Sequence, residues 1–270
     1  MSDFETLELI DDPRGFATLW LNRPEKNNAF NALMIRELIV ALDQLQADPG
    51  LRFLLIRGRG KHFSAGADLA WMQQSANLDY NTNLDDAHEL AELMYSLERL
   101  KMPTLAVVQG AAFGGALGLI SCCDIAIAAD DALFCLSEVR IGLAPAVISP
   151  FVVQAIGERA ARRYALTAER FDGVRAQQLG LVAECYSAAQ MDHQVEQWID
   201  NLLLNSPQAM RSSKALLREM GDGELTAARR RYCENTIARI RISAEGQEGL
   251  RAFLDKRPPA WQPAKKEPHP

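Results

Sequence analysis

Hydrophobic positions follow two different periods in the first half of this chain. Short strand-like apolar runs cover residues 17–21, 53–57, 104–109 and 124–129. Between the first two runs, apolar residues recur at helical spacing, and Asn31 stands where a helix N-cap is expected. We expect this stripe to pack in the core; its members are Met34, Leu38, Ala41, Leu42 and Leu45. Strands that alternate with helices predict an α/β fold.

The pattern changes near Ser149-Pro150, which predicts a helix start with a capping hydroxyl followed by proline. From there to about Leu254 the chain is mainly helical in pattern. Amphipathic stretches cover residues 192–204, 208–220, 225–242 and 245–254. Their apolar faces must pack on another surface, for which a second subunit is one candidate. Beyond Arg257 the proline-rich sequence predicts a loosely ordered tail.

Composition limits the class of protein. With 270 residues and 48% hydrophobic content, the chain can form one large domain, or one domain with an appendage. It shows no secretion signal and no apolar run long enough to span a bilayer, so we expect a cytoplasmic protein. A net charge of −6 argues against nucleic-acid binding. Five cysteines without CxxC spacing favour buried thiols, and the four histidines lack ligand spacing, so no metal site is predicted.

Two segments far apart in the sequence, residues 63–69 and 110–115, carry almost no bulky side chains at their centres. Small residues let a substrate carbonyl approach backbone N–H groups, which is what an oxyanion hole requires. Gly115 would open a helix, where N–H groups have no intrahelical acceptor. The alternatives are close helix–strand packing at the glycines and a capping role for Asp68. The glycine motifs of nucleotide-triphosphate sites and of serine hydrolases are absent from the sequence.

Glu138 follows an apolar run, where a surface carboxylate is not expected. A partly desolvated glutamate has a raised pKa and can act as a general acid or base. The alternative is a salt bridge to Arg140 or Arg162. A basic cluster at residues 57–62, with Arg57, Arg59, Lys61 and His62, is either a solvated loop or a small phosphate-binding patch.

Several motifs occur in an order that resembles the crotonase (enoyl-CoA hydratase/isomerase) superfamily, over about residues 4–261. They are Asn22-Arg23-Pro24, residues 28–31, 63–69, 110–115 and 123–125, Glu138, and residues 248–257. The resemblance implies a spiral of ββα units over residues 1–195, a C-terminal helical trimerisation region over 196–257, and a tail over 258–270. It also implies a homotrimer or a dimer of trimers.

The resemblance further implies a CoA thioester substrate, so that coenzyme A is part of the substrate and no separate cofactor is expected. The thioester oxygen would accept hydrogen bonds from the N–H groups of Ala67 and Gly115. Two segments would line the adenine and pantetheine parts of the substrate, one with Lys26 and Asn28 and the other with Ala65, Gly66, Asp68 and Leu69. Gly114 would also contact the substrate. The basic cluster then becomes a neighbour of the CoA phosphates.

Typical hydratases of this family carry a second catalytic glutamate where this chain has Gly118. A glycine in a helix costs about 1 kcal/mol relative to alanine, so Gly118 indicates either tight packing or room for a branched or carboxylated acyl group. We expect room, with Glu138 as the sole carboxylate near the reacting carbons. Arg140 is a candidate to bind a substrate carboxylate, because an arginine fork suits that group; the alternative is a pairing of Arg140 with Glu138 or a surface acid.

The stretch from Glu138 to Ser149 is similar to that of bacterial family members that hydrate 3-methylglutaconyl-CoA in leucine breakdown or γ-carboxygeranoyl-CoA in terpene breakdown. The sequence therefore predicts water addition to a branched, carboxylated 2-enoyl-CoA. One alternative is an enoyl-CoA isomerase that uses Glu138 as a proton shuttle. A second alternative is a non-catalytic acyl-CoA-binding relative.

Overall fold

A computed structural model describes residues 4–221 and 223–262 of the chain. Its main sheet has six strands in the order β1-β2-β3-β4-β6-β9, and a second sheet has three in the order β5-β7-β8. The strands are β1 (Leu7–Asp12), β2 (Phe16–Leu21), β3 (Leu54–Gly58), β4 (Thr104–Val108), β5 (Ala111–Phe113), β6 (Ile125–Ala129), β7 (Leu133–Cys135), β8 (Phe171–Asp172) and β9 (Glu184–Tyr186). All neighbours in the main sheet are parallel except the β1–β2 hairpin.

Helices connect the parallel strands, as an α/β fold requires. The α-helices are α1 (Ala32–Ala47), α2 (Leu69–Ser75), α3 (Tyr80–Glu98), α4 (Gly115–Cys122), α5 (Ser149–Ile156), α6 (Glu158–Thr167), α7 (Gly173–Leu179), α8 (Met191–Leu203), α9 (Pro207–Met220), α10 (Ala227–Ile242) and α11 (Ala244–Leu254). Two short 3₁₀ helices are η1 (Pro24–Lys26) and η2 (Glu138–Ile141). The predicted α/β class is confirmed.

Two predicted helix starts have different outcomes. The Asn31 side chain accepts a hydrogen bond from the Met34 N–H, and the apolar stripe of α1 is buried, so both predictions for this helix are confirmed. Helix α5 does begin at Ser149, but Ile148 is its cap residue and the Ser149 hydroxyl donates to the Ala146 carbonyl instead. The predicted capping role of that hydroxyl is wrong, because Ser149 already has helical geometry.

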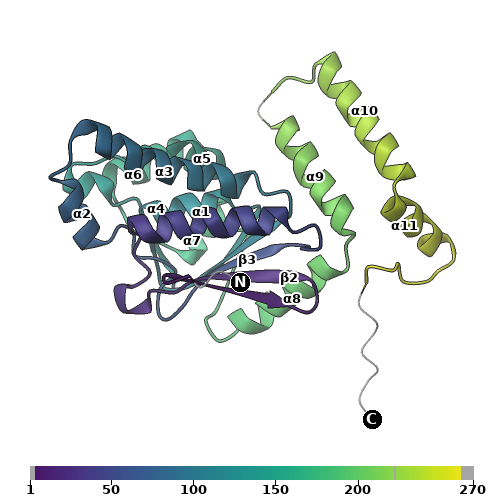
Figure 1. Cartoon of the computed structure of the whole chain (residues 1–270), viewed down its shortest axis with the longest axis horizontal. Helices are drawn as coiled ribbons and strands as arrows, with labels where there is room; N and C mark the ends of the chain where they lie inside the picture. The colour runs from purple at the N-terminus through teal and green to yellow at the C-terminus, as the bar shows by residue number, and fades with distance from the viewer. Residues whose placement is uncertain (1–3, 222, 263–270) are drawn as a thin grey trace, which may run out of the picture.

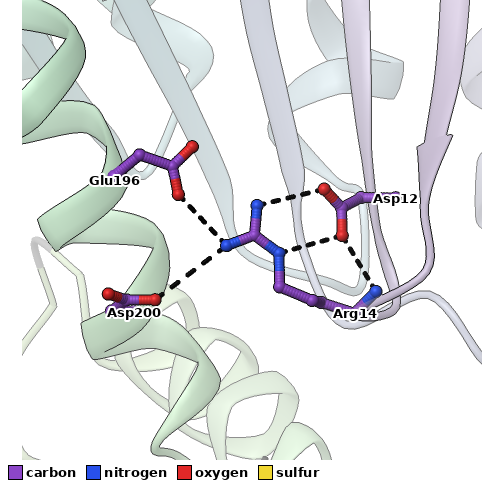
Figure 2. Close-up of polar contacts among 4 residues, drawn as sticks. All are labelled: Asp12, Arg14, Glu196 and Asp200. Atoms are coloured by element: carbon purple, nitrogen blue, oxygen red, sulfur yellow. Dashed lines mark hydrogen bonds and ion pairs between the residues drawn. The ribbon is translucent and has the colours of Figure 1, made fainter. Parts of the chain in front are cut away.

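Helix α8 spans residue 195, where the sequence predicts the end of the core. Its side chains Val195, Ile199 and Leu203 are buried, so the helix packs in the core. Figure 2 shows how the β1–β2 turn is tied to it. The Arg14 guanidinium contacts Asp12 at 3.0 Å and Glu196 at 3.1 Å. Hydrogen bonding to Asp12, opposed by partial burial and supported by Glu196, raises the pKa of Arg14 above its ordinary value. The core therefore continues through α8.

Helices α9, α10 and α11 extend to one side of the sheet and its covering helices (Figure 1). No side chain of α9 or α10 is buried in the described chain. Residues 258–262 are not loosely held, because the Trp261 indole donates to the Leu204 carbonyl and the Trp261 carbonyl accepts from Arg52. Residues 263–270 of the predicted tail lie outside the described residues. Across the described part of the chain, no helix is both long and apolar enough to cross a membrane.

Candidate active site

The two small-residue segments of the sequence meet in the fold. Ser64 and Ala112 form a parallel bridge, with Ser64 N–H donating to Ala111 O at 3.0 Å and Phe113 N–H donating to Ser64 O at 3.0 Å. A Cβ atom on Gly66 would lie 3.2 Å from the Phe113 carbonyl oxygen. The backbone of the first segment therefore runs directly against the start of the second.

One of the predicted donors, the Ala67 N–H, faces away from the bridge that holds its segment. Phe30 N–H donates to Gly66 O at 2.7 Å, and Asp68 N–H donates to Phe30 O at 2.8 Å. In such a parallel bridge the intervening residue directs its own N–H to the opposite side. Ala67 is exposed, and its N–H has no acceptor within residues 4–221 and 223–262. It is free to bind a ligand oxygen.

The second donor stands at the first turn of α4. Gly114 has φ 55° and ψ −122°, a conformation that favours glycine, and its N–H donates to Cys135 O at 2.9 Å. Gly115 follows as the first helical residue, so its N–H lacks an intrahelical acceptor and lies at the positive end of the helix dipole. An N–H group at such a helix terminus can donate a hydrogen bond to an anionic oxygen.

The Glu138 carboxyl group lies beside Gly114, at the start of α4. Its Oε1 lies 3.3 Å from the position that a Cβ on Gly114 would take. Its Oε2 is buried and has no hydrogen-bond partner in the described part of the chain. Desolvation by burial raises the pKa of Glu138 above its ordinary value of 4.5. The raised pKa predicted from the sequence is thus present.

Neither arginine suggested as a partner pairs with Glu138. Arg140 donates to the Ala168 carbonyl at 2.8 Å, and Arg162 pairs with Glu158 on α6. Among the residues that the structure describes, no ion pair to Glu138 is found. The salt-bridge alternatives for Glu138 and Arg140 are therefore wrong, and the Arg140 guanidinium is engaged by a backbone acceptor.

The room expected beside Gly118 is absent. A Cβ on Gly118 would lie 2.4 Å from Ile148 Cγ2 and 3.0 Å from Met94 Cε. Both side chains are buried, at 2% and 0% exposure. Gly118 is thus explained by tight packing, and this corrects the expectation of open space for an acyl group.

The remaining predicted contact residues divide into two groups. Asn28 is fully buried, and its amide bonds the backbone at Arg23, Arg59 and His62. The Asp68 carboxylate caps α2 and pairs with Arg23 at 2.9 Å. These two side chains hold loops in place and offer no free group.

Other residues of the predicted set remain accessible. Lys26 and Leu69 are exposed, and Ala65 is half-buried with its N–H donated to Asn27 O. The basic cluster is partly engaged, because Arg57 and Arg59 both lie over the Trp20 ring and pair with Asp192 and Glu8 respectively. Lys61 of the basic cluster is exposed, as is Lys26 at the end of η1.

Two positioning residues had only weak sequence signals. Arg23, in the Asn22-Arg23-Pro24 motif, bonds Ala29 O as well as Asp68, and so fixes the loop that pairs with the Ala67 segment. His62 Nδ1 accepts the Ala111 N–H at 2.9 Å at the entry of the second segment. Burial, followed by the charge of Lys61, lowers the pKa of His62.

Comparison with known proteins shows the family of the chain. The sequence profile of the enoyl-CoA hydratase/isomerase family matches residues 11–264. The chain belongs to this family. An enoyl-CoA hydratase structure from Shewanella pealeana is 49% identical, with a TM-score of 0.91 and 96% coverage of each chain.

Two curated relatives show the range of activities within the family. The 2,3-dehydroadipyl-CoA hydratase of Escherichia coli is 30% identical, over 90% of this chain and 94% of that protein. The trans-2-decenoyl-[acyl-carrier-protein] isomerase of Streptococcus mutans is 30% identical, over 96% of this chain and 98% of that protein. The chain is therefore an enzyme of the enoyl-CoA hydratase type, with isomerisation as the family alternative, and an acyl-CoA thioester is the substrate class consistent with the family.

Proposed function

We propose that this enzyme adds water to a branched 2-enoyl-CoA that carries a second carboxylate, such as 3-methylglutaconyl-CoA or γ-carboxygeranoyl-CoA. The observation that carries the reaction is the Glu138 carboxyl group, desolvated and next to the Gly114-Gly115 turn. The thioester oxygen binds the N–H groups of Ala67 and Gly115, which makes the β-carbon electrophilic. Glu138 then takes a proton from the attacking water.

Support for the acyl group comes from the sequence and the relatives. The stretch from Glu138 to Ser149 resembles that of hydratases for carboxylated branched thioesters, and the Escherichia coli relative is named for a dehydroadipyl thioester. Coenzyme A enters as part of the substrate, so this reaction requires no separate cofactor. Exposed Lys61 belongs to the basic cluster that we propose as a neighbour of the CoA phosphates, and exposed Lys26 belongs to the loop that we propose to line the adenine and pantetheine path.

A panel of 2-enoyl-CoA thioesters, with and without a distal carboxylate, tests the proposal. We expect loss of enoyl absorbance and uptake of one ¹⁸O from labelled water, with the highest kcat/KM for branched, carboxylated members. Equal kcat/KM values for plain and carboxylated thioesters would reject the proposed acyl group. Glu138→Ala should lose this activity, and full activity in that variant would show that Glu138 is not the catalytic base. If the wild type and Glu138→Ala are equally inactive on every thioester of the panel, the non-catalytic acyl-CoA-binding role is favoured.

Isomerisation is the second candidate, because it requires only one carboxyl group and position 118, where typical hydratases of this family carry a second glutamate, is glycine. Ile148 and Met94 fill the space where another side chain would stand on Gly118. One carboxyl group can move a proton between two carbons of a bound thioester. A double-bond shift without ¹⁸O uptake would identify this reaction instead of hydration.

We also propose that the chain assembles as a homotrimer or a dimer of trimers through α9, α10 and α11. Large apolar side chains on these helices are exposed in the single chain, namely Leu217, Ile237, Ile242, Leu250, Phe253 and Leu254. Exposed patches of this kind are typical of subunit interfaces. Sedimentation analysis should give a trimer or hexamer mass; a monomer at micromolar concentration would contradict the assembly.

A further inference from the structure

The segment from Cys135 to Arg140 contacts the backbone of Gly114 and also carries the Glu138 carboxyl group. Cys135 is paired with Phe113 in the β5–β7 register, and its carbonyl accepts the Gly114 N–H at 2.9 Å. Three residues further on, Glu138 directs its carboxyl toward the same glycine. Any shift of this segment would change the distance between the carboxyl group and the backbone donors.

This segment is tied at both ends to a single carbonyl group. The Cys135 thiol donates to Ala168 O at 3.3 Å, and Arg140 Nη2 donates to the same oxygen at 2.8 Å. Ala168 is the C-cap of α6, with φ 50° and 1% exposure. Carbonyls at a helix C-terminus lack intrahelical donors and carry partial negative charge, so a guanidinium is well placed there.

The acceptor itself is held rigidly. Tyr164 of α6 packs on Phe171 with ring centroids 4.4 Å apart, and Phe171 stacks on Phe134 at 5.4 Å. Phe134 and Phe171 are also partners in the β7–β8 register. Because Phe134 directly precedes Cys135, the end of α6 and the start of the Glu138 segment form one packed unit.

We propose that Arg140 is a positioning residue, which with Cys135 clamps the Glu138 segment to the Ala168 carbonyl and so sets the carboxyl group against the Gly114-Gly115 turn. This proposal rests on the proposed role of Glu138 in proton transfer. It assigns Arg140 to the protein's own backbone and not to a carboxylate of the substrate. Cys135 fixes the near end of the segment and Arg140 the far end.

The kinetic test compares Arg140→Met and Arg140→Lys, with Arg163→Met as the matched control. Arg163 is an exposed arginine on α6, whereas Arg140 is in η2. The Arg163 guanidinium pairs with Glu169, and in the described part of the chain no hydrogen bond or ion pair joins it to residues 135–140. For Arg140→Met we expect kcat to fall about 10- to 100-fold, since a small misplacement has effects of this size. The fall should be equal for plain and carboxylated thioesters, with KM changed by less than about twofold. Arg140→Lys should recover part of the loss, and Arg163→Met should match wild type.

The pH profile gives a second kinetic measurement. The acid limb of kcat should move to lower pH in Arg140→Met, because a released segment would expose the carboxyl group of Glu138 to water and reduce its desolvation. A KM increase confined to carboxylated thioesters would overturn the proposal and make Arg140 a substrate-binding residue. Unchanged kcat and pH profile would overturn it as well.

A measurement without substrate separates this proposal from the proposed function. Cys135 is buried, and iodoacetamide labelling at this one cysteine can be followed by peptide mass spectrometry. Loss of the clamp should speed Cys135 labelling in Arg140→Met through local opening, with no change in Arg163→Met. Equal rates of Cys135 labelling in the wild type, Arg140→Met and Arg163→Met would refute the clamp. If wild type converts no enoyl thioester, the proposed function fails, and the labelling rates still decide whether the clamp exists.

Discussion

Replacing Gly118 with alanine should destabilise the enzyme, although alanine is the better helix former. Helix preference alone would stabilise the variant by about 1 kcal/mol. The new Cβ would lie 2.4 Å from Ile148 Cγ2, however, and 3.0 Å from Met94 Cε. Overpacking of a dense core costs about 1–3 kcal/mol. The net expectation is a free energy of unfolding lower by about 1 kcal/mol, the difference between these two effects.

The same substitution should change sign once Ile148 is shortened. Ile148→Ala alone should cost about 2–5 kcal/mol, because it leaves a cavity. In that background the 2.4 Å contact with Cγ2 is gone and only the 3.0 Å contacts with the Cβ of residue 148 and with Met94 Cε remain, so most of the overpacking is relieved and most of the helix gain of about 1 kcal/mol is recovered. The two substitutions should therefore couple by about 2 kcal/mol, which exceeds the additivity expected of separate sites.

Urea unfolding followed by circular dichroism, at one fixed protomer concentration, measures the free energy of unfolding of the wild type, the two single variants and the double variant. Ile156→Ala is the matched control. Ile156 is buried on α5, the helix that Ile148 caps, but its atoms are not among those nearest to Gly118. Gly118→Ala and Ile156→Ala should be additive. If Gly118→Ala has the same effect with and without Ile148→Ala, Ile148 does not fill the space beside Gly118 and the packing explanation is refuted.

Three further predictions follow from the site. Arg23→Met leaves the Asp68 carboxylate, 10% exposed, without its cation, so the free energy of unfolding should fall by about 3–5 kcal/mol in urea titrations; a loss below about 1 kcal/mol would contradict this. Because the pKa of His62 is lowered from 6.5 in the folded chain, the unfolded chain binds more protons below that pH, and thermal midpoints should fall as pH drops from 6.5 toward the folded pKa; rising midpoints would oppose it. The raised pKa of Glu138 places the acid limb of kcat/KM above pH 4.5, and Glu138→Gln should lower turnover about 100- to 10,000-fold and remove that limb.

Local patterns were sufficient to predict much of the fold. The Asn31 cap and the buried stripe of α1 depend on residues three to four positions apart, which the sequence displays directly. The two small-residue segments could be recognised separately because each depends on its own glycine and alanine residues. That they meet, through the Ser64–Ala112 bridge, follows from strand order and not from either segment alone.

The roles of Gly118 and Arg140 could not be predicted in the same way. Gly118 is explained by Ile148, which is 30 positions away and reaches it only when α4 and α5 pack together. Arg140 donates to a backbone carbonyl of Ala168, and every residue has such a carbonyl, so no side-chain pattern marks the acceptor. For Gly118 the sequence left tight packing and open space as alternatives, and the fold supplies a packed apolar side chain. For Arg140 the sequence offered carboxylate partners, and the fold supplies a peptide oxygen.

A single carboxyl group is chemically sufficient for the proposed hydration. In the proposed reaction Glu138 would accept a proton as the water oxygen bonds to the β-carbon, and the enolate charge would rest on the oxygen that hydrogen-bonds Ala67 and Gly115. Burial, which raises the pKa of Glu138, stabilises the neutral acid formed in that step. The acid can then return its proton to the α-carbon, and the carboxylate is regenerated. Isomerisation would use the same carboxyl group to take a proton from one carbon of the bound thioester and to return it to another carbon, so that the double bond shifts and no water is added. The choice between the reactions therefore depends on whether a water molecule fits between Glu138 and the bound thioester, and not on a second acid.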